Sequence, residues 1–406
     1  MSERQIKLVD LPLPFQIKET KVEEIQRFGK DNAYPTRIER LINRSVTARS
    51  SAQMFAKFLT GKGFKDDRMN KLVVGTDNYY KKITALDILR QAAYSVSYNH
   101  GFYIRLQYNA NNNVAGLRNE DFKNCRFGLV DSQEYAGKIV VYDNWDKANG
   151  NRYEKTKFIK VHIFNSNEQA IKHQVNSAGQ FKDYKGQIYF SFFDDAYIYP
   201  IALIEPVQYE ADTERQIQMF KNGELRRGFF MKQIIHHTQF ASKSDAEAFA
   251  EKVRGFIGGG HENSSLVVEG TFDAEGKLIA NENIHIEKIE QNVDDKLFDS
   301  YENSTANAIR KAYYAIPQIL IEYQDSKLGT TSGEALRQAS DFYNQMTDDL
   351  RSKLSASFAE IFANWKDPEF RTADWTITPL EFGEKEEAGQ IDTAFARLFH
   401  KIGILK

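Results

Sequence analysis

Apolar residues recur at helical spacing in the first hundred positions. The first run opens at Tyr34-Pro35-Thr36, where Thr36 and Glu39 form a capping-box pattern, and it ends at Gly61 and Gly63. A second run predicts a helix from about Thr84 to Tyr98, ended by Asn99-His100-Gly101. The apolar positions of the first run are Ile38, Leu41, Ile42, Val46, Phe55, Phe58 and Leu59.

After residue 101 the pattern changes to segments rich in β-branched and aromatic residues, which are typical of strands. Asn-Asn-Asn and Asn-Gly sequences separate them, as turn chemistry requires. The sequence thus predicts an α+β unit that ends near Pro206. The four predicted strands are 102–108, 138–142, 158–164 and 187–193.

The second half of the chain begins with a predicted helix over 207–222, closed by Asn222-Gly223. A β-α-β insert follows, with a first strand at 228–235, a helix opened by Ser244 and Glu247, and strands at 265–269 and 284–289. Another helix is predicted from Asp294 to Ala315, with acidic residues in its first turn and Arg310 and Lys311 in its last. Pro317 ends it.

A polar connection from Glu322 onward leads to a capping box at Thr331 and Glu334, which opens the longest predicted helix. Its apolar stripe covers about 30 positions, against about 11 to 12 residues for a mean helix. We therefore predict an elongated subunit that packs against copies of itself. A last strand at 374–379 and a short helix at 390–402 complete the chain. The stripe contains Leu336, Tyr343, Met346, Leu350, Leu354, Phe358, Ile361 and Trp365.

The charge balance argues against a dedicated nucleic-acid-binding protein. The 406 residues include 54 Lys and Arg against 56 Asp and Glu, a net charge of -2. Proteins that grip nucleic acid usually carry a basic surplus, because they neutralise phosphates. Any contact with DNA is therefore expected to be weak, transient or local. The chain is long enough for two or three packed units.

Other features indicate a soluble protein made in the cytoplasm. The single Cys125 can form neither an internal disulfide nor a zinc cluster, and is interpreted as a lone thiol. The N-terminus lacks the continuous apolar segment of a signal peptide. The longest apolar stretch, around Tyr197–Ile204, contains Pro200 and is too short to span a bilayer.

The candidate metal and phosphate motifs are weak. The glycine-rich segment 256–265 lacks the Gly-Lys-Ser/Thr of a phosphate loop and follows a helix, so a helix end is the better interpretation. His236 and His237 are adjacent, so on a strand they point to opposite faces. His261 and Glu262 have no third ligand nearby, and His162 and His285 lie in predicted strands.

Paired carboxylates provide the sharpest enzyme hypothesis. Asp194 and Asp195 follow an aromatic strand and could hold a metal in a nucleic-acid enzyme, although a strand-end turn is the more common use of such a pair. Arg37, Arg40 and Arg44 form a stripe on the first helix, which we interpret as a solvated or intersubunit face. We predict no catalytic residue, no metal and no cofactor.

Several stretches, in their order along the chain, resemble the portal proteins of tailed bacteriophages. They cover nearly the whole sequence, and each is weak alone. The resembling segments are Asn32-Ala-Tyr-Pro with the helix through Ser51, Phe58-Leu-Thr-Gly-Lys-Gly-Phe, the helix and strand from Tyr94 to Tyr108, Gln216–Gly223, Ala306–Leu320, Thr331-Ser-Gly-Glu-Ala-Leu and Leu398–Leu405.

The resemblance implies an α+β portal fold with wing, stem helices, clip, tunnel loop, long kinked helix and a short C-terminal crown. By this resemblance, the segments are a wing (1–206), an outgoing stem helix (207–227), a clip (228–292), a returning stem helix (293–316), a tunnel loop (317–332), a long helix and wing return (333–382) and a crown with a C-terminal helix (383–406).

The same resemblance implies a dodecameric ring at one capsid vertex, in the virion, through which double-stranded DNA is packaged and ejected. The implied partners are the large terminase, which would hydrolyse ATP, the major capsid protein, and head-completion adaptor or tail proteins; no membrane is involved. The tunnel-loop residues Gln324, Asp325, Ser326 and Lys327 would face DNA. The alternative hypothesis is a metal-dependent nucleic-acid enzyme that uses Asp194 and Asp195.

Overall fold

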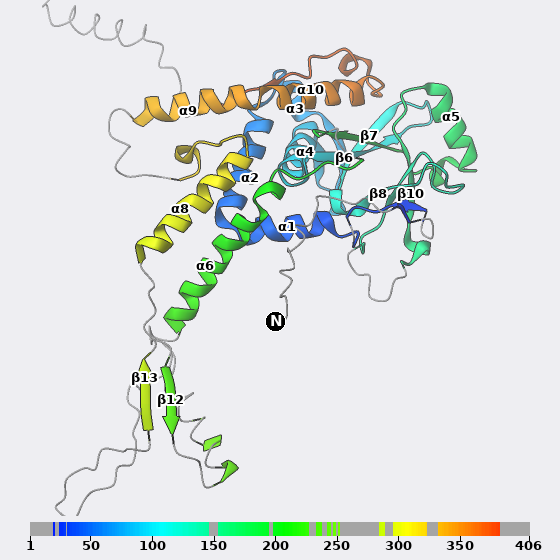
Figure 1. Ribbon diagram of the computed structural model, residues 1–406. Helices are drawn as coiled ribbons and strands as arrows, with labels where there is room; N and C mark the ends of the chain where they lie inside the picture. Colours follow the sequence, from blue (N-terminus) through cyan, green and yellow to red (C-terminus); the bar gives the residue numbers. More distant parts are fainter. Residues whose placement is uncertain are drawn as a thin grey trace, which may run out of the picture. The chain divides into compact units, whose positions relative to one another are not determined.

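The computed structural model in Figure 1 describes residues 19–20, 24–29, 31–145, 153–194, 198–226, 233–237, 242–244, 247–248, 251, 284–288, 295–322 and 332–381. The chain divides into two compact units, residues 1–208 with 308–406, and residues 209–307. Among the helices of these ranges, none is long and apolar enough to cross a membrane.

A six-stranded sheet forms the centre of the first unit, in the order β7-β6-β11-β10-β9-β8. Only β10 and β11 pair in parallel, and the chain between them contains helix α5 (Glu168–Ser177), which supplies the crossover that parallel strands need. The four predicted strands are confirmed in place. The strands are β6 (Gly101–Tyr108), β7 (Val114–Glu120), β8 (Cys125–Phe127), β9 (Lys138–Val141), β10 (Ile159–Ile163) and β11 (Gln187–Phe192).

The first predicted helix is two helices, α1 (Tyr34–Arg44) and α2 (Val46–Thr60). Ser45 stands between them in an extended conformation, and its side chain accepts a hydrogen bond from the Ala48 amide, which caps α2. The predicted capping box is therefore wrong: α1 begins at Tyr34, with Pro35 in its first turn and no side-chain cap. Glu39 instead pairs with Lys123 at 3.0 Å.

Helix α4 (Ala85–Asn99) confirms the second predicted helix, and Thr84 and Asp87 form a capping box at its start. Short ladders complete the unit. The remaining elements are β1 (Glu19–Thr20) with β2 (Ile25–Gln26), β4 (Val73–Thr76) with β5 (Lys82–Thr84), β3 (Gly63–Phe64) with β14 (Ile377–Thr378), and helix α3 (Asp67–Lys71). The last predicted strand is thus confirmed as β14, shorter than expected.

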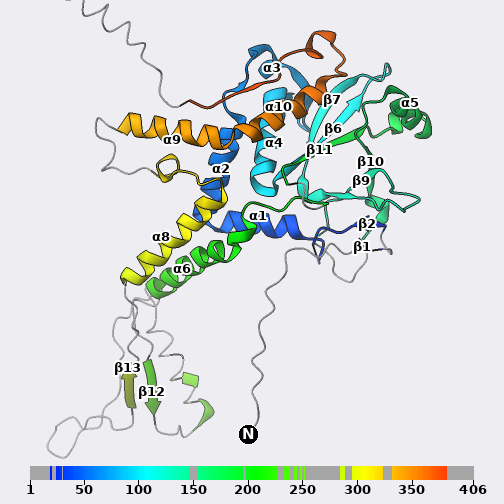
Figure 2. The same cartoon turned by 45° about the horizontal axis from the view of Figure 1, so that its top comes forward.

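The long predicted helix is also broken, into α9 (Ser332–Met346) and α10 (Asp348–Phe362), which follow one another in both views (Figures 1 and 2). Arg351 is buried at the break at Thr347. Its guanidinium donates to the Asn344 carbonyl at 2.7 Å and to the Thr347 hydroxyl at 2.7 Å. The arginine thus satisfies a carbonyl at the end of α9, as a helix end requires.

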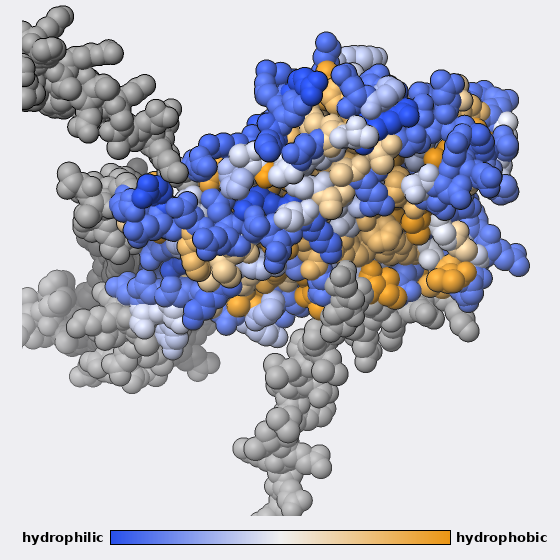
Figure 3. Space-filling model, turned by 90° about the horizontal axis from the view of Figure 1, so that it is seen from above, coloured by the Kyte–Doolittle hydropathy of each residue, from blue (hydrophilic) through white to orange (hydrophobic). Residues whose placement is uncertain are grey.

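Most of the apolar stripe of this region lies inside the subunit, although Met346 is exposed. Tyr343, Leu354 and Phe358 are fully buried within one chain. Their partners come from the N-terminal part: Phe58 meets Tyr343 edge to face at 4.8 Å between ring centroids. Viewed from above, hydrophilic residues cover most of the first unit, and apolar ones gather near the middle of that face (Figure 3).

The second unit contains most of α6 (Gln208–Arg226) and α8 (Asp295–Ala312), joined by a Lys221–Glu302 ion pair of 2.6 Å. Gly223 was predicted to end α6, but the helix continues through it to Arg226. Strands β12 (Gln233–His237) and β13 (Ile284–Lys288) pair antiparallel, and residues 243–244, 247–248 and 251 are helical. Predicted features at 256–269 lie outside the described residues.

A buried arginine explains why Asn32-Ala-Tyr-Pro matters to the fold. Arg126 on β8 is fully buried, and its guanidinium donates to the Asn32 side-chain and main-chain oxygens at 2.6 and 2.7 Å and to the Cys125 carbonyl at 2.7 Å. Asn32 reaches it from a left-handed backbone conformation (φ 57°). The faces of Phe28 and Trp145 cover the cation at 5.7 and 5.5 Å.

We expect Arg126→Met to lower the free energy of unfolding by about 3 kcal/mol, because several buried oxygens lose their donor together. Urea midpoints measure this loss. Arg68→Met is the matched control, since the Arg68 side chain is 72% exposed and pairs with Asp66 at the surface, so its midpoint should stay unchanged. Equal midpoints for the two variants would show that the buried network contributes nothing.

Candidate functional site

The connection between α8 and α9 is the segment that, by the resemblance to portal proteins, is expected to face DNA. The structure describes its base, residues 313–322, and α9 from Ser332 onward. Gln324, Asp325, Ser326 and Lys327 lie outside the described residues. The contacts of residues 313–322 show how the fold directs the chain into this segment.

A tight turn fixes the direction in which the chain leaves α8. Tyr314 and Ala315 both take left-handed backbone conformations, with φ of 58° and 52°. The Ile316 amide then donates back to the Arg310 carbonyl at 3.1 Å. Tyr313 is fully buried, and its carbonyl accepts from the Tyr343 hydroxyl at 2.8 Å. The helix predicted to reach Ala315 therefore ends at Ala312, in a turn held to α9.

Polar contacts then hold the last described residue of the base. After Pro317, a single 3-10 turn over Gln318–Leu320 leads to Glu322. The Glu322 carboxylate lies 3.4 Å from the Arg310 guanidinium and accepts from the Gln318 amide at 2.6 Å. Arg310 was predicted only as a dipole partner at the end of α8. Its side chain is 8% exposed, so it anchors the connection from inside the fold.

One of the two aspartates of the enzyme hypothesis lies within the described residues. Asp194 follows β11, whereas Asp195 lies outside the described residues. The charge of Asp194 acts on the pKa values of His100 and Tyr314. In the ranges that the structure describes, no three His, Cys, Asp or Glu side chains come close enough to hold a metal ion.

The remaining candidate residues that the structure describes lie in the core, on strands or on the solvated surface. Cys125 is buried on β8, as a lone core thiol, and burial raises its pKa. His162 is half-buried on β10, where burial and the charge of Lys138 lower its pKa. Arg37 pairs with Asp31 at 2.8 Å, and Arg40 and Arg44 are exposed, as a solvated stripe requires. His236, His237 and His285 lie on β12 and β13, and His261 and Glu262 lie outside the described residues.

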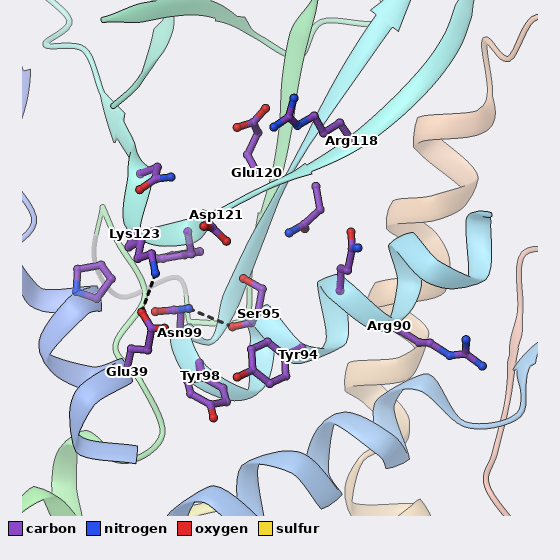
Figure 4. Close-up of a pocket in the computed structure, with 15 residues that line it drawn as sticks. Glu39, Arg90, Tyr94, Ser95, Tyr98, Asn99, Arg118, Glu120, Asp121 and Lys123 are labelled. Atoms are coloured by element: carbon purple, nitrogen blue, oxygen red, sulfur yellow. Dashed lines mark hydrogen bonds and ion pairs between the residues drawn. The ribbon is translucent and has the colours of Figure 1, made fainter. Parts of the chain in front are cut away.

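A cavity of about 590 Å³, which sequence reasoning missed, opens between α1, α4 and β7 (Figure 4). Its lining charges are balanced, and burial raises the pKa of Glu120. Such a lining suits a polar protein surface better than a phosphate. The charges come from separate segments, so no local motif marks the cavity. The charged lining residues are Glu39, Arg90, Arg118, Glu120, Asp121 and Lys123.

No protein-family model and no curated protein matches the sequence. The structure matches a chain of the virion of a native gene transfer agent (GTA) particle, with a TM-score of 0.50 and 10% identity over 91% of this chain and 89% of that chain. The sequence-based resemblance is thereby confirmed as a likeness of fold, over most of the chain.

Two further solved structures are similar at lower scores. A chain from the neck of the native GTA particle, computed with C12 symmetry, has a TM-score of 0.49 and 11% identity over 91% of this chain and 89% of that one. An HK97 family phage portal protein from Corynebacterium diphtheriae has a TM-score of 0.35 and 9% identity over 73% and 83%.

The strained turn at the base leads to a first prediction for this region. Ala315→Gly should raise the free energy of unfolding by up to about 1 kcal/mol, because glycine adopts the left-handed conformation without a steric cost. The same substitution inside α8, Ala308→Gly, should lower it by about 1 kcal/mol. Thermal or urea unfolding of both variants tests the difference. Destabilisation by Ala315→Gly would contradict the left-handed turn.

His100 leads to a second prediction, about pH. Burial lowers its pKa to about 4, so the unfolded chain binds the proton more readily between pH 6.5 and pH 4. Stability should therefore be complete above about pH 6.5 and fall by about 3 kcal/mol as the pH drops through this window. His100→Asn keeps a residue that tolerates the left-handed conformation at the end of α4 (φ 59°) and should remove this component. Parallel pH profiles for the two proteins would contradict a buried neutral histidine.

Proposed function

We propose that this chain is the subunit of a portal ring at one vertex of a viral capsid, the channel for packaging and ejection of double-stranded DNA. The observation that carries the proposal is the fold shared with a chain of a GTA virion over 91% of this chain and 89% of that one. The motifs that resemble phage portal proteins point to the same role. The ring would be a dodecamer, as that resemblance implies.

The order of elements along the chain supports a division of labour. Helices α6 and α8 stand on either side of residues 227–294, and the segment between α8 and α9 follows directly. We infer that α6 and α8 are the stem helices, that 228–292 is the clip that docks terminase and later the head-completion or tail proteins, and that 383–406 forms a short crown. The sheet unit would be the wing, next to the major capsid protein.

The charge of the chain fits a channel that DNA passes through without being held. The net charge is -2, and the connection from Glu322 to Thr330 carries one cation, Lys327. A dense ring of cations would bind phosphates strongly and slow translocation. A ring instead repeats one weak contact once per subunit. The anchoring of Glu322 by Arg310 fixes where each copy of the connection begins.

The metal-dependent enzyme hypothesis receives no support from the described residues. In the described ranges, no three His, Cys, Asp or Glu side chains come close enough to hold a metal ion. We prefer the portal proposal because it rests on the shared fold. ATP hydrolysis would belong to the separate terminase.

Lys327→Glu tests the proposed DNA path. In a ring it places a negative charge in every copy of the loop, so packaging or retention of the genome should fall while rings still form. Genome content per capsid, measured beside ring assembly, gives the readout.

The matched control is Lys172→Glu, the same charge change on exposed α5, which is distant from α9 within the first unit (Figure 1). It should package normally. Normal genome content for Lys327→Glu at every salt concentration would remove Lys327 from the DNA path.

A further inference from the structure

The hairpin of β4 and β5 ends in two tyrosines that do not pack against their own subunit. Tyr79 and Tyr80 are each 90% exposed, more than any other aromatic residue that the structure describes. Two adjacent aromatic rings in water require an explanation, because such side chains stabilise a protein mainly when they are buried. Lys81 and Lys82 follow and are also exposed. We call residues 79–82 the hairpin tip.

Hydrogen bonds hold the turn of this hairpin in one conformation. The Asp77 carboxylate accepts from the amides of Tyr79 and Lys81, at 2.8 and 2.9 Å, and the Asp77 amide donates to the Lys81 carbonyl at 2.9 Å. Tyr80 takes a left-handed backbone conformation (φ 63°), for which glycine or asparagine is the usual residue. Because a tyrosine gives the turn no advantage there, its ring is best explained by a contact outside the subunit.

A second exposed apolar surface lies where α9 meets α10. Phe342 and Met346 are four residues apart, and thus on one side of α9, and they are 47% and 42% exposed. Asp341 and Asp349 flank them and are exposed as well. We call these four residues the α9–α10 patch. The patch and the hairpin tip both combine apolar with charged side chains, and their charges are opposite.

The two surfaces belong to different parts of the first unit. The hairpin lies against the edge strand β7, where a Cβ on Gly75 would stand 3.0 Å from the Leu117 carbonyl oxygen. On α10, four residues after Asp349, the Lys353 amine donates to the Phe192 carbonyl at the end of β11, and β6 separates β11 from β7. Since tip and patch are both exposed, neither covers the other within one subunit. A closed ring requires such a pair of different, complementary surfaces on each subunit.

We propose that the hairpin tip of one subunit docks on the α9–α10 patch of a second copy of this chain. The tyrosine rings pack on Phe342 and Met346, as aromatic and thioether side chains favour. The two lysines face Asp341 and Asp349, which sets the orientation of the contact.

The area that the tip can bury fits the centre of a subunit interface. A tyrosine buries about 150 to 250 Å², and a stable interface takes about 800 Å² from each partner. Two tyrosines therefore supply a large part of one side, and tyrosine is among the residues on which binding most depends. This inference rests on the proposed portal ring and deepens it, so the experiments measure ring assembly and the contact separately.

Removal of the two rings tests the contribution of the tip. Tyr79→Ser with Tyr80→Asn should raise the protein concentration for half-maximal ring assembly about tenfold or more, measured by native mass spectrometry. The thermal midpoint of the dissociated subunit should stay unchanged, because both side chains are exposed and asparagine tolerates the left-handed conformation. Phe181→Ser, at another exposed aromatic residue of the first unit, is the control and should assemble normally. Normal assembly of the double variant would overturn the docking and leave the portal proposal standing.

Charge exchange tests whether the patch is the partner of the tip. Lys81→Glu with Lys82→Glu should weaken assembly about tenfold, and so should Asp341→Lys with Asp349→Lys, because like charges then face each other. All four substitutions together restore opposite charges and should recover assembly. Lys81 also acts electrostatically on Asp87 within its own chain, so the thermal midpoint of each variant is measured beside assembly. Two impaired pairs without recovery in the combination would show that the tip docks elsewhere.

Disulfide trapping locates the contact in the full chain. Tyr79→Cys with Met346→Cys should give a ladder of disulfide-linked subunits, up to the closed ring, under non-reducing conditions. Native Cys125 is buried and does not compete. Lys172→Cys on exposed α5, combined with Met346→Cys, is the control pair and should give no ladder.

The outcomes separate the docking from the ring itself. Rings that cross-link no faster than the control pair, or that form the disulfide within one chain, would overturn the docking while the portal proposal stands. A chain that never forms rings would overturn the portal proposal, and the docking with it.

Discussion

Burial of helix α2 by segments from the far end of the chain holds the first unit together. Phe55 stacks on Tyr314 with ring centroids 5.5 Å apart, and the Phe58 ring meets Tyr343. Where α2 ends, Gly61 is required, because a Cβ there would stand 1.9 Å from the Thr378 carbonyl oxygen. The turn after α8, the α9–α10 break and strand β14 are all positioned against this one helix. The base of the proposed tunnel loop depends on it as well.

This constraint explains which parts of the fold the sequence predicts. Local signals suffice for α4, whose capping box and apolar period agree, and for β6 and β11, which are rich in aromatic and branched apolar residues. They fail where tertiary contacts decide. Ser45 and Thr347 interrupt runs of unbroken helical period, and Arg351 supports the second break from four residues beyond it.

The missed strands have the same explanation. β7 contains Gly116 and three charged or amide residues at its end, and it becomes a strand because β6 offers it a partner over its whole length. Conversely, Gly223 was predicted to stop α6, yet the helix continues past it to Arg226. A glycine permits a helix end but does not impose one.

The site was predictable only in outline. The order of two helices around a polar, proline-led segment is visible in the sequence, so the position of the proposed loop could be assigned. Its anchor could not, because the Arg310–Glu322 contact depends on a turn that no spacing rule describes. The cavity between α1, α4 and β7 was equally unpredictable, since it collects residues from segments that are far apart in the chain.

The central claim is that this fold builds a closed ring. A cyclic assembly needs two different, complementary faces on each subunit, and it closes at a fixed number of copies. Native mass spectrometry of the purified chain, with electron-microscope images of the same sample, measures this directly. The account predicts a single closed oligomer with a central channel, twelvefold in the capsid. A strictly monomeric protein at all concentrations, with no ring under packaging conditions, would contradict it.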